Sequence, residues 1–193
     1  MKKILIATKN KGKIKEFKEM LTPLGYEVQS LLDLKEEIEI EETGTTFEEN
    51  AYIKAKAIYD LYHCDVISDD SGLCIDFFEG GPGVYSARWL GVDTSYDYKN
   101  NYILDKMKDS KDRKAQYVCC IAHINEEGSH EIYRGECIGE IALKPEGSNG
   151  FGYDPIFYYP PYQTTLANVS EEDKNTISHR GIALEKLLEG MSK

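Results

Sequence analysis

Several common patterns are missing from this sequence of 193 residues, and each absence narrows its class. No apolar run reaches 18 residues, so we expect no membrane-spanning helix and no membrane partner. The five cysteines are odd in number and lack CxxC spacing, which favours reduced thiols in a cytoplasmic protein and argues against a zinc site. The first apolar run, residues 4–7, is too short for a signal peptide and is typical of a first strand.

Basic residues are also few, because 34 acids face 23 bases and the net charge is −11. Nucleic acids are bound mainly through basic side chains, so we expect no nucleic-acid partner. The charges are unevenly distributed: residues 2–18 hold seven lysines and one acid, whereas residues 33–49 hold eight acids and one lysine. This division suits a metal-bound polyanion, with lysines on phosphates and carboxylates on the metal. Two solvated faces of opposite sign are the simpler explanation of the charges alone.

A strand, a loop and a helix are expected at the start of the chain. Residues 3–8 suit a buried strand, residues 9–13 form a lysine-bearing loop, and apolar residues recur at helical spacing from Ile14 to Leu24, until Gly25. A helix N-terminus after such a loop can bind phosphate through backbone N–H groups, the helix dipole and lysines. The loop matches neither a Walker A motif nor GxGxxG, and an ordinary turn with solvated lysines fits it equally well.

A longer helix is expected after the acidic stretch. Thr45 and Glu48 have the spacing of a capping box, with Thr45 as the N-cap. Asn50 and Lys54 are four residues apart, so they share a helix face and could reach one ligand. In an isolated helix these positions would simply be solvated.

Two adjacent acids, Asp69 and Asp70, follow the β-branched run of residues 65–68. We expect a buried strand, two carboxylates and then a sharp turn at Gly72. Buried acids are costly unless a positive group lies against them. In an extended chain the two side chains point to opposite faces, so at most one of them would face a metal directly.

The second half of the chain is expected to contain a hairpin and a binding loop. Residues 116–124 and 131–142 have the pattern of two paired strands. The loop of residues 145–157 is rich in glycine and aromatic residues and is too long to be a connector alone. It presents Phe151 between two glycines, although a core aromatic in a tight turn is the alternative. A terminal helix is expected over residues 182–188.

Seven segments, taken in order, resemble one family: the inosine triphosphate pyrophosphatases, also called XTP/dITP diphosphatases or HAM1-like proteins. The segments run from residue 7 to residue 181 and so cover nearly the whole chain. They are ATKNKGK (7–13), EETG (41–44), TFEENA (46–51) with Lys54, DDSGL (69–73), PGVYSAR (82–88), GFGYDP (150–155), and KN (174–175) with SHRG (178–181).

This resemblance implies a nucleoside triphosphate diphosphatase. Its substrates would be the deaminated purine nucleotides ITP, dITP and XTP, which it would hydrolyse to the monophosphate and pyrophosphate with Mg²⁺, clearing them from the nucleotide pool. The implied fold is α/β, a single domain over residues 1–193 with an elongated, mixed, strongly twisted central sheet and helices on both sides. It would have two lobes, with the active site in the cleft between them. The resemblance also implies a homodimer.

The resemblance further assigns the site residues. Glu41 and Asp70 would hold Mg²⁺, and Asp70 would act as the general base. Ser71 would contact the nucleotide, and Lys54 would reach a phosphate. The triphosphate would be cradled by Thr8, Lys9, Asn10, Lys11, Gly12 and Lys13. The base would be bound by Phe151, Gly152, Tyr153, Asp154, Lys174, His179 and Arg180.

Base selectivity follows from hydrogen-bonding chemistry. Hypoxanthine and xanthine carry an oxygen at C6, which accepts a hydrogen bond where adenine carries an amino donor. Donors such as Lys174 and Arg180 would bind that oxygen and be left unpaired by adenine. Two departures from the family pattern, Asn168 and Glu146, bear on fine substrate preference only.

Two other functions are compatible with parts of the pattern. One is a catalytically silent nucleotide-binding protein, which would have lost a metal-binding carboxylate; here Glu41 and Asp70 are both present. The other is a pyrophosphatase for other nucleotides, like the similarly folded Maf-like proteins. The set formed by residues 151–154 with His179 and Arg180 argues against that alternative.

Overall fold

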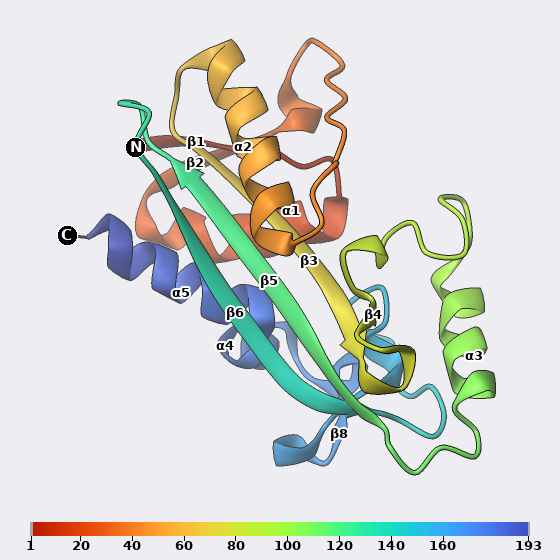
Figure 1. Cartoon of the computed structure of the whole chain (residues 1–193). Coiled ribbons are helices and arrows are strands. Elements are labelled where there is room, and N and C mark those ends of the chain that lie inside the picture. The colour runs from red at the N-terminus through yellow and green to blue at the C-terminus, as the bar shows by residue number, and fades with distance from the viewer. Residues whose placement is uncertain (1, 193) are drawn as a thin grey trace. The chain divides into compact units, whose positions relative to one another are not determined.

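The chain combines helices and strands in a computed structural model that describes residues 2–192 (Figure 1). The helices are α1 (Lys11–Leu21), α2 (Phe47–Tyr62), α3 (Tyr96–Lys106), α4 (Glu171–Ile177) and α5 (His179–Met191). The strands are β1 (Lys2–Ile6), β2 (Tyr26–Ser30), β3 (Val66–Ile75), β4 (Gly81–Pro82), β5 (Lys114–Ile124), β6 (His130–Ile141), β7 (Phe157–Tyr159) and β8 (Thr164–Thr165). None of the helices within residues 2–192 combines the length and apolarity needed to cross a membrane.

The strands form one mixed sheet in the order β2-β1-β3-β5-β6-β7-β8, with β4 paired to β3. β1 runs parallel to β2 and to β3, so that Leu5 lies opposite both Gln29 and Val66. β7 runs antiparallel to β6 and β8. This arrangement confirms the predicted α/β class with a mixed sheet. The predicted strands of the second half correspond to β5 and β6, which are neighbours in the sheet.

Two compact units divide the chain. Within the described residues, unit 1 consists of residues 2–70, 119–134 and 183–192, and unit 2 consists of residues 71–118 and 135–182. The boundaries fall inside β3, β5, β6 and α5, so no flexible linker separates the units in the sequence. The single domain and the cleft between two lobes stay predictions.

The core of unit 1 is built from α1, α5 and the strands next to them. Phe17 and Leu21 of α1 are fully buried with Ile6 of β1, Ile67 of β3 and Leu187 of α5. The helical spacing predicted for α1 is thereby confirmed over most of its length, since this stripe lies on one helix face. The terminal helix is also confirmed, although it begins earlier than predicted.

The end of α1 differs from the prediction. The helix stops at Leu21, and a 3₁₀ turn over Thr22–Leu24 follows, with Pro23 in its first positions. Leu24 is consequently 55% exposed rather than part of the buried stripe. Gly25 does terminate the segment, and its φ of 87° is the left-handed conformation that glycine adopts without strain.

The capping box of α2 lies one residue later than predicted. Thr46 is the N-cap: its hydroxyl accepts the N–H of Glu49, while the carboxylate of Glu49 accepts the N–H groups of Thr45 and Thr46. Both alignments place a threonine three residues before a glutamate, so the spacing alone could not separate them. Glu48 instead contacts Arg134, with Oε1 and Nη1 2.8 Å apart.

The predicted turn at Gly72 is wrong, because β3 continues through it to Ile75. Glycine is required there for a different reason. A Cβ at Gly72 would lie 2.2 Å from the carbonyl oxygen of Gly83 and 2.6 Å from Oγ of Ser86. Because Gly72 has no side chain, residues 83–86 can approach β3 closely. Oγ of Ser86 accepts the N–H of Leu73 at 2.9 Å.

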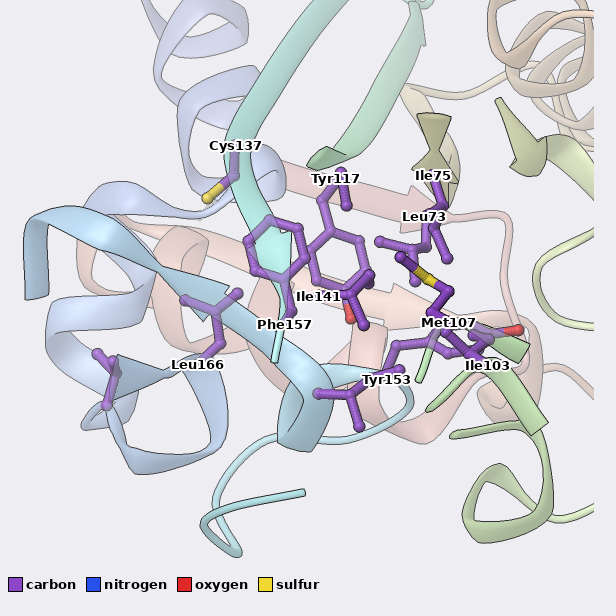
Figure 2. Close-up of a cluster of buried hydrophobic side chains, with 13 residues drawn as sticks. Leu73, Ile75, Ile103, Met107, Tyr117, Cys137, Ile141, Tyr153, Phe157 and Leu166 are labelled. Atoms are coloured by element: carbon purple, nitrogen blue, oxygen red, sulfur yellow. The ribbon is translucent and has the colours of Figure 1, made fainter. Parts of the chain in front are cut away.

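Unit 2 has a separate core of aromatic and branched side chains (Figure 2). Tyr117 of β5 and Phe157 of β7 lie at its centre, with ring centroids 4.6 Å apart. Leu73 and Ile75 of β3 are buried in the same cluster. This core positions the end of β3 and the loop after β6, both of which carry predicted site residues.

Candidate active site

The side chain of Asn10 organises the lysine-bearing loop between β1 and α1 through hydrogen bonds. The side-chain oxygen of Asn10 accepts the N–H groups of Gly12 at 2.9 Å and of Lys13 at 3.2 Å. The N–H of Asn10 in turn donates to Oγ1 of Thr8 at 3.2 Å. The structure therefore brings together four of the residues predicted to bind phosphate. The backbone N–H groups of Gly12 and Lys13 already have an acceptor in this arrangement, which the sequence did not indicate.

Lys13 is the lysine of this loop that is partly buried. Its ammonium lies 2.9 Å from Oδ2 of Asp69, and the two side chains are 14% and 0% exposed. Lys9 and Lys11 are exposed, and the ammonium of Lys9 lies 3.8 Å from Oε1 of Glu37. A buried carboxylate is stabilised only by a well-placed opposite charge, so Lys13 supplies the positive group predicted next to Asp69.

Asp70 has a different cation beside it. The ammonium of Lys54 lies 3.9 Å from Oδ1 of Asp70 and 3.0 Å from Oε1 of Glu42, and it donates to the backbone oxygen of Asp69 at 2.7 Å. Lys54 comes from the buried face of α2 and Asp70 from β3. We call Lys13, Glu42, Lys54, Asp69 and Asp70 the acidic–lysine cluster.

Burial and charge shift the pKa values in this cluster. Burial is the largest cause that raises the pKa of Asp70 to about 6, and the charge of Glu42 adds to it. Lys54 and Lys13 act in the opposite direction. Burial by itself would lower the pKa of Lys54, but the charges of Asp69, Asp70 and Glu42 raise it above its ordinary value. Asp70 is therefore a more basic carboxylate than an exposed aspartate.

The loop that carries Glu41 and Glu42 is held by the first turn of α2. Oδ1 of Asn50 accepts the N–H of Gly44 at 2.8 Å, and a Cβ at Gly44 would lie only 2.7 Å from that oxygen. Glu42 points to Lys54, whereas Glu41 is exposed. Within residues 2–192, Glu41 makes no side-chain hydrogen bond or ion pair. Its carboxylate is thus available to a ligand from outside the chain.

The acidic–lysine cluster fits a Mg²⁺ ion by the chemistry of its donors. Asp70 offers one buried carboxylate and Glu41 offers an exposed one, whereas Oε1 of Glu42 is already held by the ammonium of Lys54. Over the part of the chain that is described, no group of three or more His, Cys, Asp or Glu side chains is arranged to hold a metal. Mg²⁺ commonly takes one or two carboxylates and completes its shell with water and substrate phosphates.

A second group of predicted residues comes together within unit 2. Oδ2 of Asp154 accepts the ammonium of Lys174 at 2.8 Å and the N–H of Phe151 at 3.0 Å. Oδ1 of Asp154 accepts the hydroxyl of Tyr117 at 3.2 Å. The ammonium of Lys174 also lies 5.1 Å from the centroid of the Phe151 ring, a cation–π distance.

His179 joins this group through its ring. The imidazole stacks on the Tyr117 ring with centroids 4.5 Å apart and planes 8° from parallel. The next residue, Arg180, is 2% exposed, and its Nη2 donates to Oγ of Ser71 at 3.1 Å. We call Tyr117, Phe151, Asp154, Lys174 and His179 the ring cluster.

The remaining two predicted residues support the loop that carries Phe151. The carbonyl oxygen of Gly152 accepts a hydrogen bond from Asn100 of α3 at 3.2 Å. Tyr153 is 3% exposed, and its hydroxyl donates to the carbonyl oxygen of Ser86 at 2.5 Å. The ring of Tyr153 belongs to the core of unit 2, so it anchors the loop from inside.

Sequence reasoning did not assign a role to Glu42, Tyr117, Ser86 or Asn100. Tyr117 lies in a predicted strand, where an aromatic residue is ordinary, and nothing in the pattern connects it with residues 154 and 179. Glu42 is adjacent to the assigned Glu41, and only the direction of each side chain separates them. These contacts depend on tertiary structure, so a single sequence carries no signal for them.

A family model described as the Ham1 family matches residues 4–190. The chain belongs to the Ham1 family. Its Ham1 relatives include a protein of an Exiguobacterium strain, 46% identical over 185 residues, which cover 96% of this chain and 94% of that protein. A protein of Oceanobacillus iheyensis is 47% identical over 190 residues, covering 97% and 96%. Both relatives are named dITP/XTP pyrophosphatase.

Solved Ham1 structures share the fold over nearly their whole length. The Staphylococcus aureus Ham1 protein matches with a TM-score of 0.87 and 42% identity, covering 98% of this chain and 100% of that one. A HAM1 protein from Coxiella burnetii matches with a TM-score of 0.89 and 39% identity, covering 100% and 99%.

Proposed function

We propose that this chain hydrolyses ITP, dITP and XTP to the nucleoside monophosphate and pyrophosphate, and so removes deaminated purines from the nucleotide pool. The observation that carries the proposal is its match, over nearly the full length, to Ham1 relatives named dITP/XTP pyrophosphatase. The contacts of Lys13, Lys54 and Asp70 in unit 1 and of Asp154 and Lys174 in unit 2 support the proposal.

The acidic–lysine cluster is proposed to act on the triphosphate. Lys13 and Lys54 would bind phosphate oxygens, with the Thr8–Lys13 loop around them. Glu41 and Asp70 would hold Mg²⁺, which when bound supplies charge neutralisation on the phosphates and acidifies a water. Asp70 would accept the proton of the attacking water, which bound Mg²⁺ makes more acidic.

The ring cluster is proposed to bind the purine base. Lys174 is held by Asp154 and by the Phe151 ring, so its ammonium is preorganised as a hydrogen-bond donor. An oxygen at C6 of the base would accept from such a donor, whereas the amino group of adenine would leave it unpaired. This difference is the proposed basis of selectivity against adenine. Guanine also carries an oxygen at C6, so its exclusion would come from contacts around C2.

The proposal also covers the oligomeric state and the cellular location. We propose a homodimer, as the family resemblance implies, and a location in the cytoplasm. The odd number of cysteines and the lack of CxxC spacing support this compartment. The partner of the site is a small nucleotide.

The test is pyrophosphate release from ITP, XTP, dATP and dGTP, measured with and without Mg²⁺. We expect rapid release from ITP and XTP only, and none in the presence of a chelator. Monophosphate and pyrophosphate must appear in equal amounts, because the cut is proposed between the α- and β-phosphates. Equal turnover of all four nucleotides would contradict the proposed selectivity, and release of inorganic phosphate would contradict the proposed bond.

A further inference from the structure

Tyr117 contacts two residues of the ring cluster at once, although the family resemblance gives it no role. It lies on β5 and is 6% exposed. Its hydroxyl donates to Oδ1 of Asp154, and its ring stacks against the imidazole of His179. One side chain thus joins two residues that are proposed to bind the base but lie far apart in the sequence.

The hydroxyl completes the set of donors around a buried carboxylate. Asp154 is 2% exposed, so solvent has little access to it. Oδ2 of Asp154 accepts hydrogen bonds from the Lys174 ammonium and from the N–H of Phe151, and Oδ1 accepts one from the Tyr117 hydroxyl. An ionised carboxylate only accepts hydrogen bonds, and without the Tyr117 hydroxyl the buried Oδ1 would lose this donor at a cost that rotation of the carboxylate could relieve. Such a rotation would move the ammonium of Lys174.

The hydroxyl stays a donor at any pH at which the enzyme would work. Burial, followed by the charge of Asp154, raises the pKa of Tyr117 well above its ordinary value of 10.0. The ring is fixed as well, because Phe157 packs beside it with centroids 4.6 Å apart, as Figure 2 shows. The plane of Tyr117 therefore sets the plane of the imidazole stacked on it.

We propose that Tyr117 is a positioning residue for base selectivity, whose hydroxyl fixes Asp154 and through it the Lys174 ammonium, and whose ring fixes His179. This inference rests on the proposed function, in which Lys174 donates to the oxygen at C6. Adenine gains nothing from a correctly placed Lys174. Misplacing that ammonium therefore lowers turnover of ITP more than turnover of ATP.

The substitution Tyr117→Phe isolates the hydroxyl, because it keeps the ring that stacks on His179. We expect kcat/KM for ITP to fall about tenfold, mainly through KM, while kcat/KM for ATP changes less than twofold. Tyr133→Phe is the matched control. It also removes a tyrosine hydroxyl that donates to a carboxylate, that of Glu131, but it lies in unit 1 and outside both clusters. The control should leave the ratio of kcat/KM for ITP to kcat/KM for ATP, called the ITP to ATP ratio below, unchanged.

A double-mutant cycle tests whether Tyr117 acts through Asp154. In an Asp154→Asn background, Tyr117→Phe should change the ITP to ATP ratio by less than twofold, because the carboxylate that it orients is gone. All variants are compared at a temperature at which circular dichroism shows them folded. A full tenfold effect of Tyr117→Phe in the Asp154→Asn background would overturn the proposed route.

The outcomes separate this inference from the proposed function. If the unsubstituted protein releases no pyrophosphate from ITP, the proposed function fails and this inference fails with it. If that protein is active and Tyr117→Phe keeps its ITP to ATP ratio, only the inference is overturned. An equal loss for ITP and ATP would show a merely structural role for Tyr117, and it would overturn the inference too.

Discussion

The ammonium of Lys13 lies 2.9 Å from Oδ2 of Asp69, whose side chain is fully buried. This ion pair distinguishes Asp69 from the adjacent Asp70. Asp69 orients a lysine at the start of α1, while Asp70 faces Lys54 and Glu42. The two acids therefore carry different cations, as expected for neighbours on opposite faces of a strand.

Asp69→Asn should weaken nucleotide binding without removing the chemistry. Lys13 would lose its anchor, so we expect KM for ITP to rise about tenfold with kcat changed less than threefold. The free energy of unfolding should fall by about 3 kcal/mol, because one charge of a buried pair is left behind. Steady-state kinetics and urea unfolding measure the two effects.

Asp65→Asn is the matched control for Asp69→Asn. Asp65 is also a buried acid of unit 1, and its Oδ2 lies 2.9 Å from the ammonium of Lys2. Its loss should lower stability but leave KM unchanged. If both variants raised KM equally, the effect would be one of general stability, and the assigned role of Asp69 would be wrong.

Asp70→Asn should remove activity and stabilise the metal-free protein. Burial raises the pKa of Asp70 from 3.8 to about 6, so between these values the folded protein retains a proton that the unfolded chain releases. Stability of the unsubstituted protein should therefore fall as pH rises from about 4 to about 6. Above that range the variant should be more stable by about 1–3 kcal/mol, and near pH 4 the two proteins should be equal.

Chemical denaturation in EDTA across this pH range measures the difference between Asp70→Asn and its parent. ITP binding should persist in the variant while turnover is lost. A variant that is less stable than its parent at pH 8 would show that Lys54 and Lys13 outweigh burial. Full turnover by the variant would show that Asp70 is not the base.

Glu41→Gln and Glu42→Gln should separate the two adjacent acids. Oε1 of Glu42 is already bound to Lys54 at 3.0 Å, whereas Glu41 is exposed and available. We expect Glu41→Gln to weaken Mn²⁺ binding about tenfold. Electron paramagnetic resonance of the bound Mn²⁺ measures this affinity. Glu42→Gln should weaken it less than threefold. The opposite order would assign the metal to Glu42 instead.

Gly181→Ala should disturb base binding as well as stability. A Cβ there would lie 1.8 Å from the carbonyl oxygen of Asn175, at the junction of α4 and α5 that carries Lys174 and His179. We expect a loss of about 1–3 kcal/mol in unfolding free energy and a raised KM for ITP. Thermal unfolding and kinetics measure both quantities.

The matched glycine for Gly181→Ala is Gly190, near the other end of α5, where a Cβ would lie 2.1 Å from the hydroxyl oxygen of Tyr133. It lies in unit 1 and outside both clusters. Gly190→Ala should lower stability with KM unchanged. A normal KM in Gly181→Ala would mean that α4 and α5 absorb the change away from the site.

Local pattern was sufficient for much of the fold. Helical spacing located α1, the pattern of two paired strands located β5 and β6, and a β-branched run located β3, because each signal depends on neighbours in the sequence. The predictions were wrong where two local alignments fitted the sequence equally well, or where contacts with residues distant in the sequence determined the structure. The capping box could shift by one residue, and Gly72 served the approach of residues 83–86 rather than a turn.

The site was predictable only as a set of residue types. The sequence indicated that lysines and acids would meet, but not that Lys13 belongs to Asp69 and Lys54 to Asp70. Tyr117 could not be found at all, since its importance depends on the loop that brings Asp154 to it and the helix that brings His179. Which side chains share a hydrogen bond is decided by packing across long sequence distances.

The first turn of α2 has one further consequence for the loop before it. The backbone N–H groups of Gly44, Thr45 and Thr46 all donate to side chains of that turn, those of Asn50 and Glu49. Three successive amides are therefore released from their acceptors only when the helix itself frays. Their hydrogens should exchange with deuterated solvent together with the amides of the α2 terminus, as one cooperative opening unit.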